Sequence, residues 1–176
     1  MNYFTFYDIP ESFNVDENLV KRKFYELSKT YHPDFYINHS VEKQQEILEL
    51  STINNKAYQI LSKPSKRLEY ILQLRGHGIE GEKYQLPQDF FMQMMEVNEA
   101  LMELEFDPDQ SVLDRTKVQI DGIEEELNSE LSALTGHFDE QNTGEKENLL
   151  LKIKDIYYRQ KYLLRIRDSL NKFASR

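Results

Sequence analysis

The chain has 176 residues, of which 39% are hydrophobic, and it contains 10 Phe, 11 Tyr and no Cys. Without Cys it has no disulfide framework, thiol nucleophile or cysteine-based metal site, and no apolar run reaches the roughly 18 residues of a membrane span. The net charge of −9 lies in residues 76–176, because acidic and basic residues balance in residues 1–75. This distribution argues against general nucleic-acid binding, which needs a basic surface. We expect a soluble, cytoplasmic protein with two functional halves.

The first half opens with aromatic residues 3–7, which predict one or two helical turns ended by Pro10. A longer helix follows, with Asp16 as its N-cap. Pro33 ends that helix, because proline lacks a backbone N–H and disfavours helical backbone in the residue before it. The apolar residues of this helix recur at intervals of four, three and four and predict one buried stripe: Val20, Phe24, Leu27 and Tyr31.

The tripeptide His32-Pro33-Asp34 therefore lies on a tight loop, for which there are four interpretations. The first is a bare turn. A metal site would need three or four ligands, which His39 and scattered carboxylates do not supply at a recognisable spacing. A catalytic dyad would need a nucleophile and a pocket that nothing in the sequence indicates. The fourth interpretation depends on the residues that surround the loop.

Two more helices complete the first half. Ser40 is expected to cap a helix that packs antiparallel on the previous one, and Pro64 to open a last short helix. The buried stripe of the first of these helices is expected at Ile47, Leu50, Asn54, Ala57, Tyr58 and Leu61. Residues 76–86 are rich in glycine and predict a linker, so the expected boundaries are a domain at 1–75, a linker at 76–86 and a domain at 87–176.

The first half resembles the J-domain of DnaJ-type co-chaperones. The resemblance is carried by the tripeptide, the opening Asn2-Tyr3-Phe4, the basic helix before the loop, and residues 53–61 and 63–70. It implies that His32, Pro33 and Asp34 stimulate ATP hydrolysis by a DnaK-type chaperone. The basic residues off the buried stripe would ordinarily form a solvated face, but in a J-domain they would contact an acidic face of the ATPase: Lys21, Arg22, Lys23 and Lys29. Phe35 departs from the Lys that follows the tripeptide in many J-domains.

The second half predicts three helices: Pro87 to Phe106, Ser111 to Gly136, and a long helix after a polar loop at 137–146. Short connections and apolar periods near 3.5 favour an antiparallel three-helix bundle. The expected fold class is therefore all-α. Gly122 lies inside the second of these helices, where it costs about 1 kcal/mol relative to Ala unless it permits close packing.

The helix of residues 87–106 has more apolar surface than one core stripe requires. Its core stripe is Phe90, Met94, Val97, Leu101 and Leu104, and outside it lie Phe91, Met92, Met95 and Met102, interleaved with Glu96, Glu99 and Glu103. Methionine suits adaptable binding surfaces, and carboxylates beside it select a basic partner. The alternative is that a broad face of this helix is buried against both neighbouring helices.

A J-domain followed by an acidic helical bundle resembles the HscB-type co-chaperone of iron–sulfur cluster assembly, over essentially the whole chain. The resemblance implies that residues of the 91–101 segment and its continuation contact an IscU-like cluster scaffold: Phe91, Met92, Met95, Glu96, Glu99 and Glu103. A contact from the last helix is implied at Tyr157 or Tyr158. Some eukaryotic members carry an N-terminal metal-binding cysteine extension, and a chain without Cys fits a bacterial form.

The resulting hypothesis is a non-enzymatic adaptor, without cofactor or metal, that brings the scaffold to an HscA-like DnaK-type chaperone and triggers its ATPase. A J-domain protein whose bundle recruits a different client, or only self-associates, is the alternative. A helical enzyme that uses His32 and Asp34 directly is a third possibility, but the sequence lacks a glycine-rich phosphate loop and a carboxylate–histidine metal pattern.

Overall fold

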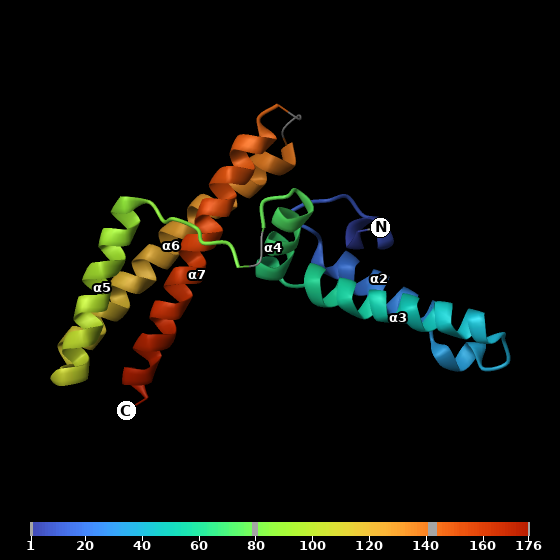
Figure 1. Ribbon diagram of the computed structural model, residues 1–176, viewed down its shortest axis with the longest axis horizontal. Coiled ribbons are helices and arrows are strands. Elements are labelled where there is room, and N and C mark those ends of the chain that lie inside the picture. Colours follow the sequence, from blue (N-terminus) through green and yellow to red (C-terminus); the bar gives the residue numbers. More distant parts are fainter. Residues whose placement is uncertain (1, 79–80, 141–143, 176) are drawn as a thin grey trace. The chain divides into compact units, whose positions relative to one another are not determined.

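The computed structural model of the protein describes residues 2–78, 81–140 and 144–175 (Figure 1). The chain divides into two compact units, Met1–Gly78 and Ile79–Arg176. All regular secondary structure in the described ranges is helical, which confirms the predicted all-α class. None of the described helices has the length and apolar character needed to cross a membrane.

The first unit is built around a helical hairpin. A short helix α1 (Tyr3–Phe6) precedes α2 (Glu17–Thr30), and the hairpin is completed by a 3₁₀ turn η1 (Pro33–Tyr36) and α3 (Val41–Leu61), followed by α4 (Pro64–Leu74). The predicted caps are confirmed: Asp16 accepts hydrogen bonds from the backbone N–H groups of the first turn of α2, and Ser40 accepts one from that of α3. Figure 1 shows η1 at the tip of the hairpin, away from α1 and α4.

Asn54 holds three elements of this unit together, although its side chain is polar and fully buried. Its Nδ2 donates to the Phe24 carbonyl at 3.1 Å and to the Ser28 hydroxyl at 3.0 Å, both on α2. Its Oδ1 accepts a hydrogen bond from the Tyr7 hydroxyl at 3.0 Å. Burial, and secondarily the neighbouring Tyr58, raises the pKa of Tyr7 well above its ordinary value, so this hydroxyl remains a donor. The buried network therefore fixes the register of α2 against α3.

A buried arginine, which the sequence analysis did not single out, fastens α4. Arg67 is only 4% exposed, and its guanidinium donates to the Phe13 carbonyl at 2.9 Å and to the Leu61 carbonyl at 2.5 Å. These carbonyls belong to the segment before α2 and to the last turn of α3. Arg67 thus links α4 both to the end of α3 and to the segment that precedes α2.

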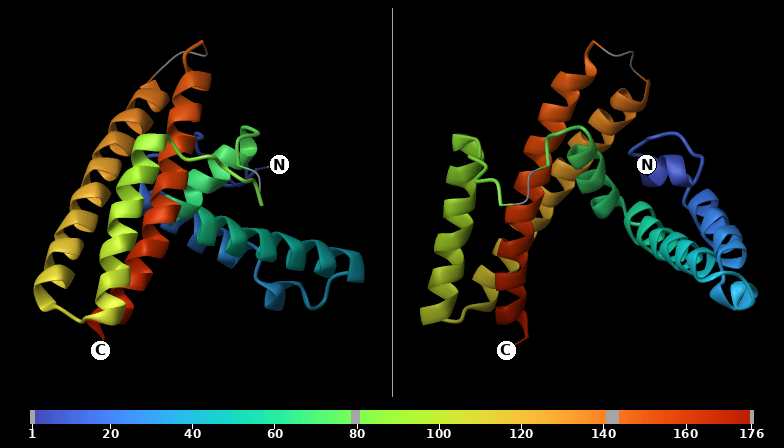
Figure 2. Two further views of the ribbon diagram at one scale, coloured as in Figure 1. Left: turned by 60° about the vertical axis from the view of Figure 1, so that its left-hand side comes forward. Right: turned by 45° about the vertical axis from the view of Figure 1, so that its right-hand side comes forward.

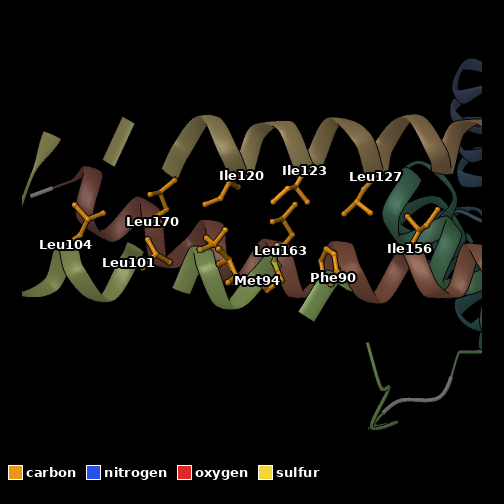
Figure 3. Packing of buried hydrophobic residues seen from close by; sticks show 12 residues of the cluster. Phe90, Met94, Leu101, Leu104, Ile120, Ile123, Leu127, Ile156, Leu163 and Leu170 are labelled. Carbon is orange, nitrogen blue, oxygen red and sulfur yellow. The ribbon is translucent and has the colours of Figure 1, made fainter. Parts of the chain in front are cut away.

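The second unit is the predicted three-helix bundle. It consists of α5 (Gln88–Phe106), α6 (Gln110–Glu140) and α7 (Lys146–Ala174), and each helix contacts the other two. Successive helices run antiparallel, as both views in Figure 2 show. The side chains of the core stripe of α5 point at α6 and α7, and Figure 3 shows them interdigitating with Ile120, Ile123, Leu127, Ile156, Leu163 and Leu170.

One local prediction in this unit is wrong. The polar loop expected at 137–146 is shorter, because α6 continues to Glu140 and α7 already includes Lys146; residues 141–143 lie outside the described ranges. Phe138 extends α6 because its ring is buried and lies 4.8 Å from the Lys146 ammonium. At the other end, α6 begins at Gln110, and the Asp109 carboxylate accepts a hydrogen bond from the Ser111 backbone N–H in the first turn at 2.8 Å.

Gly122 permits no close packing, since an added Cβ would meet nothing within 4 Å. We therefore expect Gly122→Ala to stabilise the bundle by roughly 0.5–1 kcal/mol, because Ala loses less backbone entropy on entering a helix. Chemical denaturation measured by circular dichroism would show this as a higher midpoint. Gly76→Ala is the matched opposite case, because its φ of +77° disfavours any side chain. A destabilised Gly122→Ala would contradict the described environment.

Candidate partner-binding sites

The His-Pro-Asp loop is ordered and exposed at the tip of the hairpin. His32 is the N-cap of η1, and its Nδ1 accepts a hydrogen bond from the Asp34 backbone N–H at 3.3 Å. An accepting Nδ1 places the proton of the neutral imidazole on Nε2, at the far side of the ring. The Asp34 carboxylate lies 3.8 Å from the same Nδ1 and its side chain is 83% exposed. The loop therefore presents a donor and a carboxylate to solvent.

The loop is held in place by bonds to both helices of the hairpin. The Tyr36 hydroxyl donates to the Thr30 carbonyl at the end of α2, at 2.8 Å. On the other side, the Gln44 amide of α3 donates to the carbonyls of Ile37 and His39, at 3.3 and 2.9 Å. Because these bonds order the loop before any partner arrives, binding costs less conformational entropy.

The four basic residues expected to contact a chaperone do not all share one side of α2. At about 100° per residue, Lys21, Arg22 and Lys29 fall within about 100° of one another, and all three are exposed. Lys23 falls on the other side, next to the buried stripe, and is only partly exposed. Among the residues that the structure describes, none of the four pairs with a carboxylate. Three of the four thus form one basic patch.

The second stripe of α5 is exposed, which excludes the alternative of a broadly buried helix face. Phe91, Met92 and Met95 are 48%, 58% and 47% exposed, whereas the neighbouring Phe90 and Met94 are 3% and 0% exposed. The three carboxylates predicted beside them, Glu96, Glu99 and Glu103, are exposed as well. This surface is therefore a candidate interaction site, since contiguous exposed apolar side chains rimmed by charge are characteristic of such sites.

The aromatic residues predicted on α7 are partly engaged within the second unit. The Tyr158 hydroxyl donates to Glu82 at 3.0 Å, and its ring stacks on Tyr84 at 4.4 Å. Tyr157 packs edge-on against the Tyr158 ring. The Tyr84 hydroxyl in turn donates to Asp155 at 2.7 Å, and its pKa is raised by burial and by that carboxylate. The end of the expected linker therefore packs on α7.

An aromatic residue of α7 that the sequence analysis did not identify, Tyr162, also contacts α5. Its hydroxyl accepts a hydrogen bond from the Asn98 side chain at 3.4 Å, and its ring meets the edge of Phe90. Tyr162 lies one turn after Tyr158, on the same face of α7. The four-residue spacing from Tyr158 indicates that Tyr162 lies on the same face of the helix. That this face meets Asn98 and Phe90 of α5 could not be predicted from the sequence.

Comparison with known proteins identifies both units. A DnaJ domain model matches residues 2–70, and a model described as the HSCB C-terminal oligomerisation domain matches residues 86–171. The co-chaperone protein HscB homolog of Aliivibrio salmonicida is 34% identical over 141 residues, which cover 74% of this chain and 82% of that protein. The Vibrio parahaemolyticus homolog is 35% identical over 144 residues, covering 76% and 84%. The co-chaperone protein HscB of Buchnera aphidicola is 40% identical over 92 residues, about half the length of each chain.

Solved structures agree with the fold of the whole chain. The chaperone HscB from Vibrio cholerae superposes with a TM-score of 0.69 at 23% identity, covering 99% of this chain and 98% of that one. The human co-chaperone protein HscB gives a TM-score of 0.70 at 24% identity, covering 97% and 81%. With a J-domain loop on the first unit, an HscB bundle as the second, and relatives aligned over most of their length, the chain belongs to the HscB family of J-domain co-chaperones.

Proposed function

We propose that this protein is an adaptor of iron–sulfur cluster assembly in the cytoplasm, with no catalytic reaction of its own. It delivers an IscU-like scaffold protein to an HscA-like DnaK-type chaperone and stimulates the ATPase of that chaperone. The observation that carries the proposal is that one chain presents two exposed sites of different chemistry, a His-Pro-Asp loop with a basic patch on one unit and an apolar, acidic helix face on the other.

On the first unit, the basic patch would steer the chaperone and the loop would act on it. Unpaired ammonium and guanidinium groups on α2 attract an acidic surface, which raises the association rate and orients the encounter. The ordered loop then places the His32 ring and the Asp34 carboxylate against the ATPase. Lys23 has a smaller role in this proposal, because it lies away from the patch.

On the second unit, the α5 face would hold the scaffold. Burying Phe91, Met92 and Met95 against a partner is worth roughly 1.5–3 kcal/mol each. Association itself costs about 4–15 kcal/mol, so a modest affinity is expected. The carboxylates of Glu96 and Glu99 would then select a scaffold surface that carries Lys or Arg. Tyr157 and Tyr158 would contribute from α7 only where their bonds within the unit leave ring surface uncovered.

The test is a reconstitution with purified chaperone and scaffold. ATP hydrolysis is measured with this protein alone, with the scaffold alone and with both, at concentrations below saturation. An adaptor that binds both partners should give more stimulation with both than the two separate effects added together, because tethering raises the local concentration of the scaffold. Purely additive rates would refute delivery, and would leave a J-domain protein with a different client.

Reversing the basic patch should weaken coupling to the chaperone. We expect Lys21→Glu, Arg22→Glu and Lys29→Glu together to raise the concentration for half-maximal ATPase stimulation by roughly tenfold or more. Added salt should weaken the wild type in the same way, because exposed charges are screened within about 10 Å at 0.1 M.

The matched control reverses three exposed lysines elsewhere on the same unit, Lys56, Lys63 and Lys66, with the same change in net charge. This control should stimulate nearly as the wild type does. Equal losses of ATPase stimulation in the two variants would show that net charge, and not the position of the patch, determines coupling to the chaperone.

A further inference from the structure

The exposed apolar surface of α5 does not end at Met95. Two more large apolar side chains on this helix are exposed, Met102 at 59% and Phe106 at 85%. Phe106 is the last residue of α5 and the most exposed of the large hydrophobic residues. Neither contributes to the core of the bundle, so packing within this chain does not explain them.

Helix geometry places these residues on the same side as Phe91 and Met95. At about 100° per residue, the four side chains fall within about 60° of one another around the axis of α5. The first and last of them are 15 positions apart, or about 22 Å at 1.5 Å per residue. Together they form an apolar ridge along the helix in two halves: Phe91 and Met95, then Met102 and Phe106. Asn98 lies on the ridge between its halves, and its bond to Tyr162 shows that the ridge borders α7.

Most of the carboxylates of α5 lie on one flank of the ridge, and exposed Glu105 lies on the other. Glu96, Glu99 and Glu103 fall within about 60° of one another on the flank away from the buried stripe. The helix contains no Lys or Arg. Pairing of two α5 ridges, parallel or antiparallel, would bring carboxylates together with no basic side chain of the helix to offset them. The ridge therefore suits a different protein, one with an apolar strip beside a row of basic side chains.

We propose that the scaffold-binding surface runs the full length of α5, with Met102 and Phe106 as its second half. This proposal rests on the function proposed above and adds specificity to it: the scaffold must offer an apolar strip about 22 Å long with basic residues along one edge. A partner that matches only the first half of the ridge would bind more weakly. Met102 and Phe106 are thus residues by which this protein distinguishes its own scaffold.

The experiment titrates purified scaffold against three pairs of alanine variants by calorimetry. Met102→Ala with Phe106→Ala should weaken binding roughly tenfold or more, as expected for two anchoring side chains. Phe91→Ala with Met95→Ala is the reference for the first half. Val118→Ala with Leu164→Ala removes exposed apolar side chains from α6 and α7 and should bind as the wild type does. All six side chains are exposed, so melting temperatures should stay within about 2 °C.

The outcomes separate the two proposals. Wild-type affinity of the second-half pair, with loss in the first-half pair, would overturn the extension and leave the adaptor function standing. No loss in either pair would overturn the α5 site altogether. A wild-type dimer in sedimentation, dissociated by the Met102 and Phe106 changes, would make the ridge a self-association surface instead. As a check without truncation, a photo-crosslinking amino acid in place of Phe106 should attach to the scaffold, and one in place of Val118 should not.

Discussion

Replacing His32 with Gln is expected to abolish stimulation of the chaperone's ATPase and to leave the fold intact. The ring is exposed, and the hydrogen bond that it accepts from the Asp34 N–H at 3.3 Å can be accepted by the Gln carbonyl instead. What the variant loses is the imidazole itself and its Nε2–H group. The measurement is single-turnover ATP hydrolysis by the chaperone over a range of co-chaperone concentrations, with a melting curve of each variant.

His39→Gln is the matched control, since His39 is a second exposed histidine at the end of the same loop. It should stimulate at close to the wild-type rate. Full activity of His32→Gln would contradict the assignment of the loop. A melting temperature more than about 5 °C lower would instead assign His32 a structural role, because that shift corresponds to about 1 kcal/mol in a small domain.

Truncating Phe91, Met92 and Met95 to Ala together should reduce scaffold affinity by roughly a hundredfold or more, while the bundle stays folded. All three side chains are about half exposed, so few contacts within the chain are lost. Titration of scaffold and thermal melting, measured on the same preparation, check both halves of this expectation.

Met94→Ala provides the contrast, because Met94 is on the same helix but fully buried. It should cost about 2–5 kcal/mol of stability, and the protein that remains folded should bind scaffold as the wild type does. If the triple variant behaved like Met94→Ala, losing stability but not affinity, the α5 face would be part of the core and not a binding site.

Sequence alone located the features that depend on neighbouring residues. The caps Asp16 and Ser40, the break at Pro33 and the two stripes of α5 each follow from spacings within one or two helical turns. The same reasoning failed at the end of α6, where Gly136 and His137 indicate a stop. Burial of Phe138 outweighs that local preference, and a tertiary contact of this kind leaves no mark in the pattern.

What sequence could not supply are the polar contacts between distant segments. Arg67 binds the carbonyl of Phe13, which is 54 residues away, and Tyr158 binds Glu82 at a separation of 76. Each looks like a surface residue until the fold brings its partner near. The exposure of the α5 stripe had the same limit: its position was predictable, but whether a neighbouring helix covered it was not.

The buried network at Asn54 has a consequence for genetic screens of this protein. Removing its side chain deletes its bonds to the Tyr7 hydroxyl, the Phe24 carbonyl and the Ser28 hydroxyl, at a cost of about 0.5–1.5 kcal/mol for each bond lost. The Tyr7 hydroxyl keeps its bond to the backbone carbonyl of Asn54. A growth screen would therefore report losses at both Asn54 and His32, although the Asn54 side chain is buried and offers no surface to a partner protein. Destabilising variants and binding-site variants can be told apart when the abundance of the protein is measured together with growth. A loss of stability of this size lowers the amount of folded protein in the cell. Changes in the loop or the basic patch would lower growth at normal abundance, which is the result expected for residues on the proposed chaperone-binding surface.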